Sequence, residues 1–221
     1  MRLSLCMQNI MSTTEKTQTI QVVEASLADV ESLTTIVPRS FHPVNPYIKM
    51  VLPDTAGMRQ WWTKAFVDEL LDPNCKVLTA IDHNNGSAIG ILTLRLMGAQ
   101  DRGSGLWTMY DLTEDHDKSA YQPMIAGMTE HRERTMLGTP HFLIELFGVD
   151  DAYKGRRIGK QLLSRACEIA DKAGYETFVQ ANASARAFYC KLGFEQRGKS
   201  VMPGDAEYVE YMLVRPCKRQ P

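Results

Sequence analysis

The segment HFLIELFGVD, at residues 141–150, constrains the fold of this chain more than any other feature. Residues 141–149 form its most apolar run, as expected for a strand buried on both faces at the centre of a sheet. Residues 158–173 follow with apolar side chains on one helical face: Ile158, Leu162, Leu163, Ala166, Ile169, Ala170 and Ala173. The sequence therefore predicts a central strand, a turn and a helix that packs back on the sheet.

The rest of the chain also alternates between strand and helix patterns. Alternating or β-branched runs predict further strands at 20–25, 76–82, 88–97, 175–181, 194–201 and 207–215. Helical spacing predicts helices at 27–37 (ending before Pro38), 55–71, 121–137 and 184–192. Three prolines in 42–54 predict a shaped loop. This order predicts the α/β class, as an α+β three-layer arrangement with a mixed central sheet flanked by helices.

Length and composition suit one soluble domain. The chain has 221 residues, of which 44% are apolar and 23% charged. We expect a disordered lead-in at 1–17, a single domain at 18–217 and a loop insertion at 98–120. A net charge of −1 gives no general attraction to nucleic acid or membrane. Five scattered cysteines without a C-x-x-C pair argue against disulfides or a metal site and favour a cytoplasmic location.

Basic and glycine residues crowd the start of helix 158–173. The run from Lys154 to Lys160 reads KGRRIGK, although a helix start favours anions over cations. Glycines at 155 and 159 would let the main chain approach an anion closely, and free N–H groups would bind it. Neither a P-loop nor a G-x-G-x-x-G motif is present. The alternative is a solvated basic surface.

Together with NASARAFYCKLGF at 182–194, this run resembles the GNAT superfamily of acetyl-CoA-dependent N-acetyltransferases. The motif N-x-x-A-x-x-F-Y matches at Asn182, Ala185, Phe188 and Tyr189. The pyrophosphate motif Q/R-x-x-G-x-G/A matches less well, with Lys154 first and Arg157 in place of its first glycine. Because backbone amides bind the anion in this family, a helical Arg157 would be tolerated. The element order fits the family over residues 18–215.

The resemblance implies that the anion is the pyrophosphate of acetyl-CoA, the co-substrate. The histidines show no metal-ligand spacing, so we expect no metal. The residues that would bind the pyrophosphate are Lys154, Gly155, Arg156, Arg157, Ile158, Gly159 and Lys160. Main-chain groups of Phe147 and Val149 and the amide of Asn182 would bind the pantetheine arm.

Glu145 is the acidic residue inside the central strand, and period-two alternation would place Leu143, Phe147 and Val149 on the same face. Apolar neighbours would suit it to act as the general base, and members of the family commonly place the base on this strand. The alternative is a structural pair with a basic neighbour such as Arg95.

Tyr189 matches the tyrosine with which the family often protonates the departing coenzyme thiolate. A phenol has a pKa of about 10, roughly two units above that of a thiol, and can donate to a thiolate. The alternative is a packed aromatic residue whose hydroxyl has a partner.

The acceptor is expected to be a small primary amine. The proline-rich segment 40–54 and the insertion would form its pocket, with contacts from Phe41, Tyr47, Trp107 and Tyr110. Acidic residues of the insertion would attract a cationic amine or simply face solvent: Asp111, Glu114, Asp115 and Asp117. The alternatives are acetylation of protein lysine or N-terminal amines, or a non-catalytic acyl-CoA-binding sensor. The chain would be a monomer or homodimer.

Overall fold

The computed structural model describes residues 19–101, 111–202 and 205–218. These residues form one seven-stranded sheet in the order β1-β2-β3-β4-β5-β7-β6, and only β4 and β5 are parallel neighbours. The strands are β1 (Ile20–Glu24), β2 (Cys75–Asp82), β3 (Ser87–Met97), β4 (His141–Val149), β5 (Glu176–Asn182), β6 (Glu195–Met202) and β7 (Asp205–Arg215).

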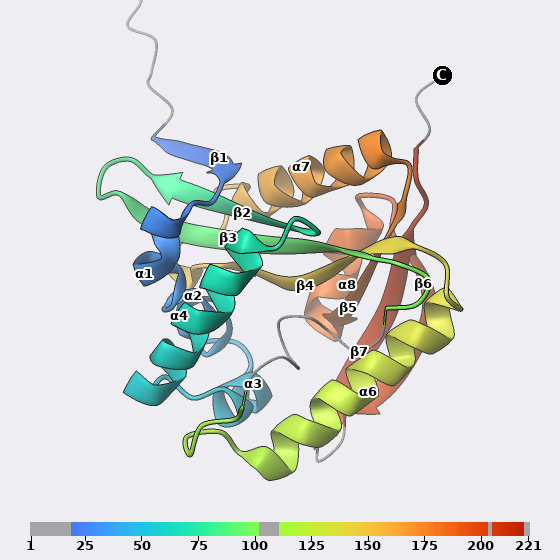
Figure 1. Cartoon of the computed structure of the whole chain (residues 1–221), viewed down its shortest axis with the longest axis horizontal. Helices are drawn as coiled ribbons and strands as arrows, with labels where there is room; N and C mark the ends of the chain where they lie inside the picture. Colours follow the sequence, from blue (N-terminus) through green and yellow to red (C-terminus); the bar gives the residue numbers. More distant parts are fainter. Residues whose placement is uncertain (1–18, 102–110, 203–204, 219–221) are drawn as a thin grey trace, which may run out of the picture.

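Helices cover both faces of this sheet (Figure 1). One layer packs around Trp62 and contains η1 (Leu27–Asp29), α1 (Val30–Leu33), α2 (Ile36–Phe41), α3 (Pro46–Val51), α4 (Ala56–Leu71) and α6 (Lys118–Met136). The other layer contains α7 (Ile158–Ala173), which follows η2 (Asp151–Tyr153), and α8 (Ala183–Cys190). The predicted three-layer α/β architecture is confirmed. None of the helices in the described part of the chain combines the length and apolarity needed to cross a bilayer.

Two predictions that relied on prolines before α4 differ from the structure. The predicted helix end before Pro38 is wrong, because Pro38 lies in the first turn of α2, where its missing N–H costs no helical hydrogen bond. The predicted loop 42–54 contains α3, which begins with Pro46 and is capped by Asn45, whose side chain accepts from Ile48 N at 3.0 Å. The predicted insertion 98–120 also ends early, because α6 begins at Lys118.

Strand β4 carries a β-bulge at Glu145. Its register against β3 jumps from Ile144–Leu94 to Leu146–Thr93, so Glu145 is the extra residue that the register skips. The Thr93 hydroxyl accepts a hydrogen bond from Leu146 N at 3.0 Å in the bulge.

The bulge reverses the side-chain alternation along β4. Glu145 points toward α4, whereas Phe147 and Val149 pack with the α7–α8 layer. Our prediction that Leu143, Glu145, Phe147 and Val149 share one face is therefore wrong, because one extra residue shifts the period-two pattern.

The two parallel strands diverge after a short ladder. β4 pairs with β5 only over His141–Ile144 and Glu176–Val179. The later residues of both strands flank an opening, which we call the seam. Beyond the seam, β4 leads through η2 into α7, and β5 leads into α8.

Candidate active site

A cavity of about 120 Å³ lies at the seam. Its walls come from both helical layers and from three strands, and they are mainly apolar with a few polar groups, as in small-molecule sites. The lining residues are Val37, Phe41, Ile48, Leu52, Met124, Met128, Ile144, Glu145, Leu146, Phe147, Val179, Gln180, Ala181, Asn182, Ala185, Tyr189, Tyr208 and Glu210.

The loop before α7 presents unused backbone donors. No backbone hydrogen bond among the described residues uses the N–H groups of Gly155 or of residues 157–160. The side chains of Lys154, Arg156, Arg157 and Lys160 are exposed around them. Free N–H groups at a helix start, surrounded by cations, form a site suited to a phosphate group.

Arg157 departs from our expectation of a helical arginine. It precedes α7 with φ 61° and ψ 15°, in the left-handed region. Glycine adopts this conformation without strain, whereas an L side chain there costs about 1–2 kcal/mol. Our expectation that Arg157 is helical, and that a side chain is therefore tolerated there, is wrong. The backbone at this position is one that favours glycine, the residue of the motif.

Replacing Arg157 by glycine is expected to raise the melting temperature by about 2–4 °C, since relief of strain of about 1 kcal/mol remains after the added entropy of the unfolded chain. Arg156→Gly is the matched control, because Arg156 lacks a positive φ and stacks 4.8 Å over the Tyr153 ring. That control should lower the melting temperature. A drop in the Arg157→Gly variant, measured by calorimetry, would contradict the strain argument.

Gly159 brings the start of α7 against the cavity wall. A Cβ atom at this position would lie 3.4 Å from Phe147 Cζ and 3.7 Å from Phe188 Cζ. A Cβ atom there would make ordinary van der Waals contacts, so the start of α7 lies directly against the end of β4 and α8.

The second motif supplies Asn182 and Tyr189. Asn182 caps α8, and its Oδ1 accepts from Ala185 N at 2.9 Å and from Ser184 Oγ at 2.8 Å. Tyr189 is buried against the edges of Phe147, Phe188 and Phe194. Burial raises the pKa of Tyr189 above its usual range and keeps the phenol protonated, as a proton donor must be. Both side chains line the cavity.

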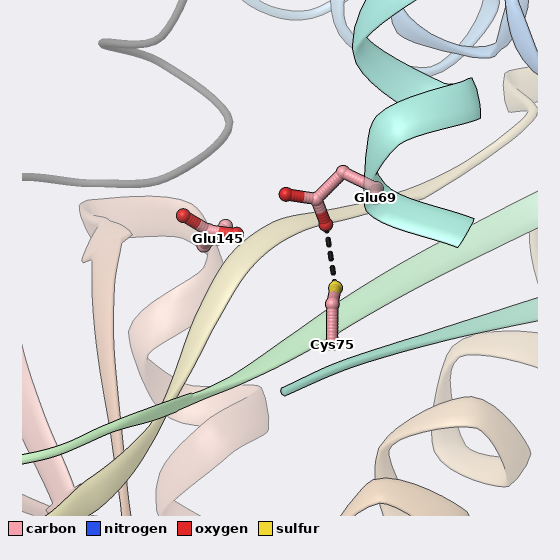
Figure 2. A group of neighbouring side chains, drawn as sticks. All are labelled: Glu69, Cys75 and Glu145. Carbon is pink, nitrogen blue, oxygen red and sulfur yellow. Dashed lines mark hydrogen bonds between the residues drawn. The ribbon is translucent and has the colours of Figure 1, made fainter. Parts of the chain in front are cut away.

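Glu145 meets Arg95, the structural alternative to a base. Arg95 Nε donates to Glu145 Oε2 at 2.9 Å, and the same guanidinium pairs with Glu69 and Asp72. The Cys75 thiol donates to Glu69 Oε2 at 2.6 Å (Figure 2). Burial, followed by the charge of Glu145, raises the pKa of Glu69, and the guanidinium opposes this shift.

Glu69, Cys75 and Glu145 lie close enough together to be considered as metal ligands (Figure 2). However, the guanidinium of Arg95 already bridges the two carboxylates and supplies the positive charge that a cation would bring. We therefore interpret the group as a buried ion-pair network. The role of Glu145 as a base stays a prediction.

Glu210 is a cavity residue that our sequence reasoning missed. Its carboxylate is buried, and burial raises its pKa to about 7. Gln180 Nε2 donates to Glu210 Oε2 at 3.3 Å. Period-two alternation in β7 places it with the buried Met212 and Val214, and this signal could have identified it.

The predicted acceptor residues have different positions. Phe41 lines the cavity, whereas Tyr47 stacks on Tyr208 with ring centroids 4.9 Å apart. Trp107 and Tyr110 lie outside the described residues. Among the acidic residues, Asp117 caps α6, and Asp115 accepts from Thr55 Oγ1 at 2.8 Å.

Comparisons with known proteins find a matching family model and many similar folds. A family model described as "Acetyltransferase (GNAT) family" matches residues 41–194. A mosquito arylalkylamine N-acetyltransferase like 5b structure is 15% identical, with 89% of this chain and 99% of that chain covered and a TM-score of 0.66. A search of curated proteins finds no match.

Two further structures contain the coenzyme. The PaiA N-acetyltransferase of Thermoplasma acidophilum with coenzyme A is 15% identical, covering 89% of this chain and 98% of that chain with a TM-score of 0.55. Arabidopsis thaliana NAA60 with acetyl-CoA is 14% identical, covering 89% and 97% with a TM-score of 0.55. At such identities these likenesses show the fold.

Proposed function

The chain belongs to the GNAT acetyltransferase family and is an acyltransferase that uses acetyl-CoA, and on this premise we propose that its acceptor is a small primary amine with an apolar body. The observation that carries the proposal is the cavity at the seam. The wall that the helices form is apolar. The end that the strands form holds the buried carboxylates of Glu145 and Glu210. An amine attached to an aryl or alkyl group matches both ends.

The loop before α7 and the seam would together bind acetyl-CoA, the acetyl donor. Free N–H groups of Gly155 and residues 157–160 would bind the pyrophosphate, with Lys154, Arg156 and Lys160 adding positive charge. Main-chain groups of β4 at Phe147 and Val149 would bind the pantetheine arm as an added strand, since β5 has already diverged there. The acetyl group would then reach the cavity.

The chemistry follows direct attack. The neutral amine forms a C–N bond with the thioester carbonyl carbon, the C–S bond breaks, and the sulfur leaves as a thiolate. Tyr189 gives its phenolic proton to that thiolate and recovers one from the acetylated nitrogen, so that coenzyme A and a neutral amide result. The position of Tyr189 in the cavity lining supports this role.

A protein acceptor is the second candidate, because the ribosomal-protein-S18-alanine N-acetyltransferase of Escherichia coli is among the solved structures similar to this chain. Most of the cavity lining is apolar, and its two carboxylates lie buried at one end, so the cavity suits the aryl or alkyl body and single ammonium group of a small amine better than a peptide chain. These features favour the small amine.

Release of free thiol from acetyl-CoA is expected with arylalkylamines such as 2-phenylethylamine and tryptamine. Spermidine, kanamycin, lysine peptides and peptides with free N-termini complete the panel. Turnover confined to peptides would overturn the small-amine proposal. A rise in melting temperature with acetyl-CoA, but no thiol release with any amine, would identify a non-catalytic sensor.

A further inference from the structure

Glu210 combines deep burial with the lack of a counter-charge. The residue is 6% exposed and lies on β7 opposite Asn182 of β5 and Ser200 of β6. Within the described residues its carboxylate accepts a hydrogen bond from Gln180 and forms no ion pair. A buried carboxylate without a cation is costly, and proteins retain such groups mainly where a ligand or a reaction uses them.

The ionisable groups around Glu210 include two tyrosines, a histidine and Glu145. Burial raises the pKa of Tyr208 to about 12 and also raises that of Tyr47, so both phenols stay neutral. His131 of α6 lies 3.4 Å from the Gln180 amide nitrogen, and burial lowers its pKa, so it is neutral above pH 7. Glu145 of β4 has Arg95 as its counter-charge.

Glu145 and Glu210 line the same cavity, but among the described residues only Glu145 is paired with a cation. The Glu145 side chain is fully buried and already paired with a guanidinium. Its Oε2 is occupied by the Arg95 Nε–H, so the ammonium group of an acceptor would have to compete with a guanidinium for this carboxylate. Glu210 lacks a cation, and burial raises its affinity for a proton to the range in which a base is most effective near pH 7.

We propose that Glu210 is the carboxylate that binds the acceptor ammonium group and removes its proton. This inference rests on the proposed function. The ammonium R–NH₃⁺ pairs with the Glu210 carboxylate and transfers one proton to it, which leaves R–NH₂ and a carboxylic acid. The neutral amine then attacks the thioester as described above, and Glu210 releases the proton to water after the product leaves.

The pH dependence of kcat/KM distinguishes this mechanism. The productive pair is ionised Glu210 with a protonated amine, so the wild-type protein should reach a plateau between about pH 7 and the amine pKa of about 10. Without the carboxylate, the enzyme must capture the neutral amine from solution. Its kcat/KM should then rise about tenfold per pH unit through this range.

Glu210→Gln is therefore expected to lower kcat/KM for 2-phenylethylamine about a hundredfold at pH 8 and about tenfold at pH 9, with the KM for acetyl-CoA unchanged. Its melting temperature should exceed that of the wild type at pH 8 and approach it near pH 4. The sign follows from linkage: a raised carboxyl pKa means that the folded chain loses stability as pH rises through about 7, and glutamine removes that loss.

Two variants serve as controls. Glu207→Gln makes the same charge change at an exposed position of β7 and should match the wild type. Glu145→Gln removes the other carboxylate of the cavity and tests whether the plateau depends on it. A Glu210→Gln enzyme with the wild-type plateau and rate, or with a lowered melting temperature at pH 8, would overturn the inference. Loss of the plateau in Glu145→Gln alone would assign the base to Glu145. A wild-type protein that acetylates no small amine would overturn the proposed function itself.

Discussion

Replacing Arg95 by methionine is expected to lower the free energy of unfolding by about 3–5 kcal/mol at pH 8. One guanidinium balances three carboxylates, those of Glu69, Asp72 and Glu145, in the layer between α4 and the sheet. Arg95 is 7% exposed and Glu69 is 2% exposed, so water cannot replace the lost cation. Removing one partner of such a network leaves uncompensated buried charge, which accounts for the size of the effect.

The loss should shrink as the pH falls. Without the guanidinium, which opposes the upward shift, the pKa of Glu69 rises further, and folded-state stability is lost as pH rises through that value. Urea unfolding at pH 5 and pH 8 measures the difference. The triple variant Arg95→Met, Glu69→Gln, Glu145→Gln should recover most of the stability because it removes the uncompensated carboxylates. An equal loss at both pH values would mean that packing, and not charge, explains the effect.

Tyr189→Phe is expected to lower turnover by up to about a thousandfold while the KM for acetyl-CoA stays nearly constant. The substitution removes only the hydroxyl, and the aromatic contacts with Phe147, Phe188 and Phe194 remain. The departing thiolate would then have to take its proton from water. Steady-state kinetics with the best amine of the panel measures the effect.

Tyr208→Phe is the matched control for this prediction. Its hydroxyl lines the same cavity but accepts a hydrogen bond from Asn45 Nδ2 at 3.0 Å, so its loss should affect acceptor binding more than turnover. Unchanged turnover in Tyr189→Phe would mean that Tyr189 is a packed aromatic residue of the core.

Local patterns predicted the framework of the site but not its details. The bounds of β4 and α7 are confirmed residue for residue, because a continuous apolar run and a one-sided helical face are strong local signals. The bulge at Glu145 depends on how β4 pairs with Thr93 of β3, and no local pattern in β4 contains that information. The left-handed backbone of Arg157 was equally hidden, since arginine itself gives no sign of positive φ.

The residues that sequence reasoning misplaced are mostly those whose role depends on distant partners. The pair of Glu145 with Arg95 was one of the alternatives considered, but Glu69, which pairs with the same guanidinium from a helix, was not foreseen. Glu210 belongs to the site because β7 lies beside β5, although the two strands are separated by α8 and β6 in the chain. Its alternation with Met212 was visible in the sequence, but its place in the cavity was not.

The seam also bears on how the fold protects its open strand edges. An unpaired strand edge is a template on which another chain can add, and proteins protect such edges with charge, shortness or cover. The outer edges follow this rule, since β1 has five residues and β6 carries Glu195, Arg197 and Lys199 on exposed positions. The diverging ends of β4 and β5 instead face each other inside the molecule, between the two helical layers. A folded neighbour cannot reach these inner edges, so the fold can keep hydrogen-bonding groups open for a slender ligand without exposing them to self-association.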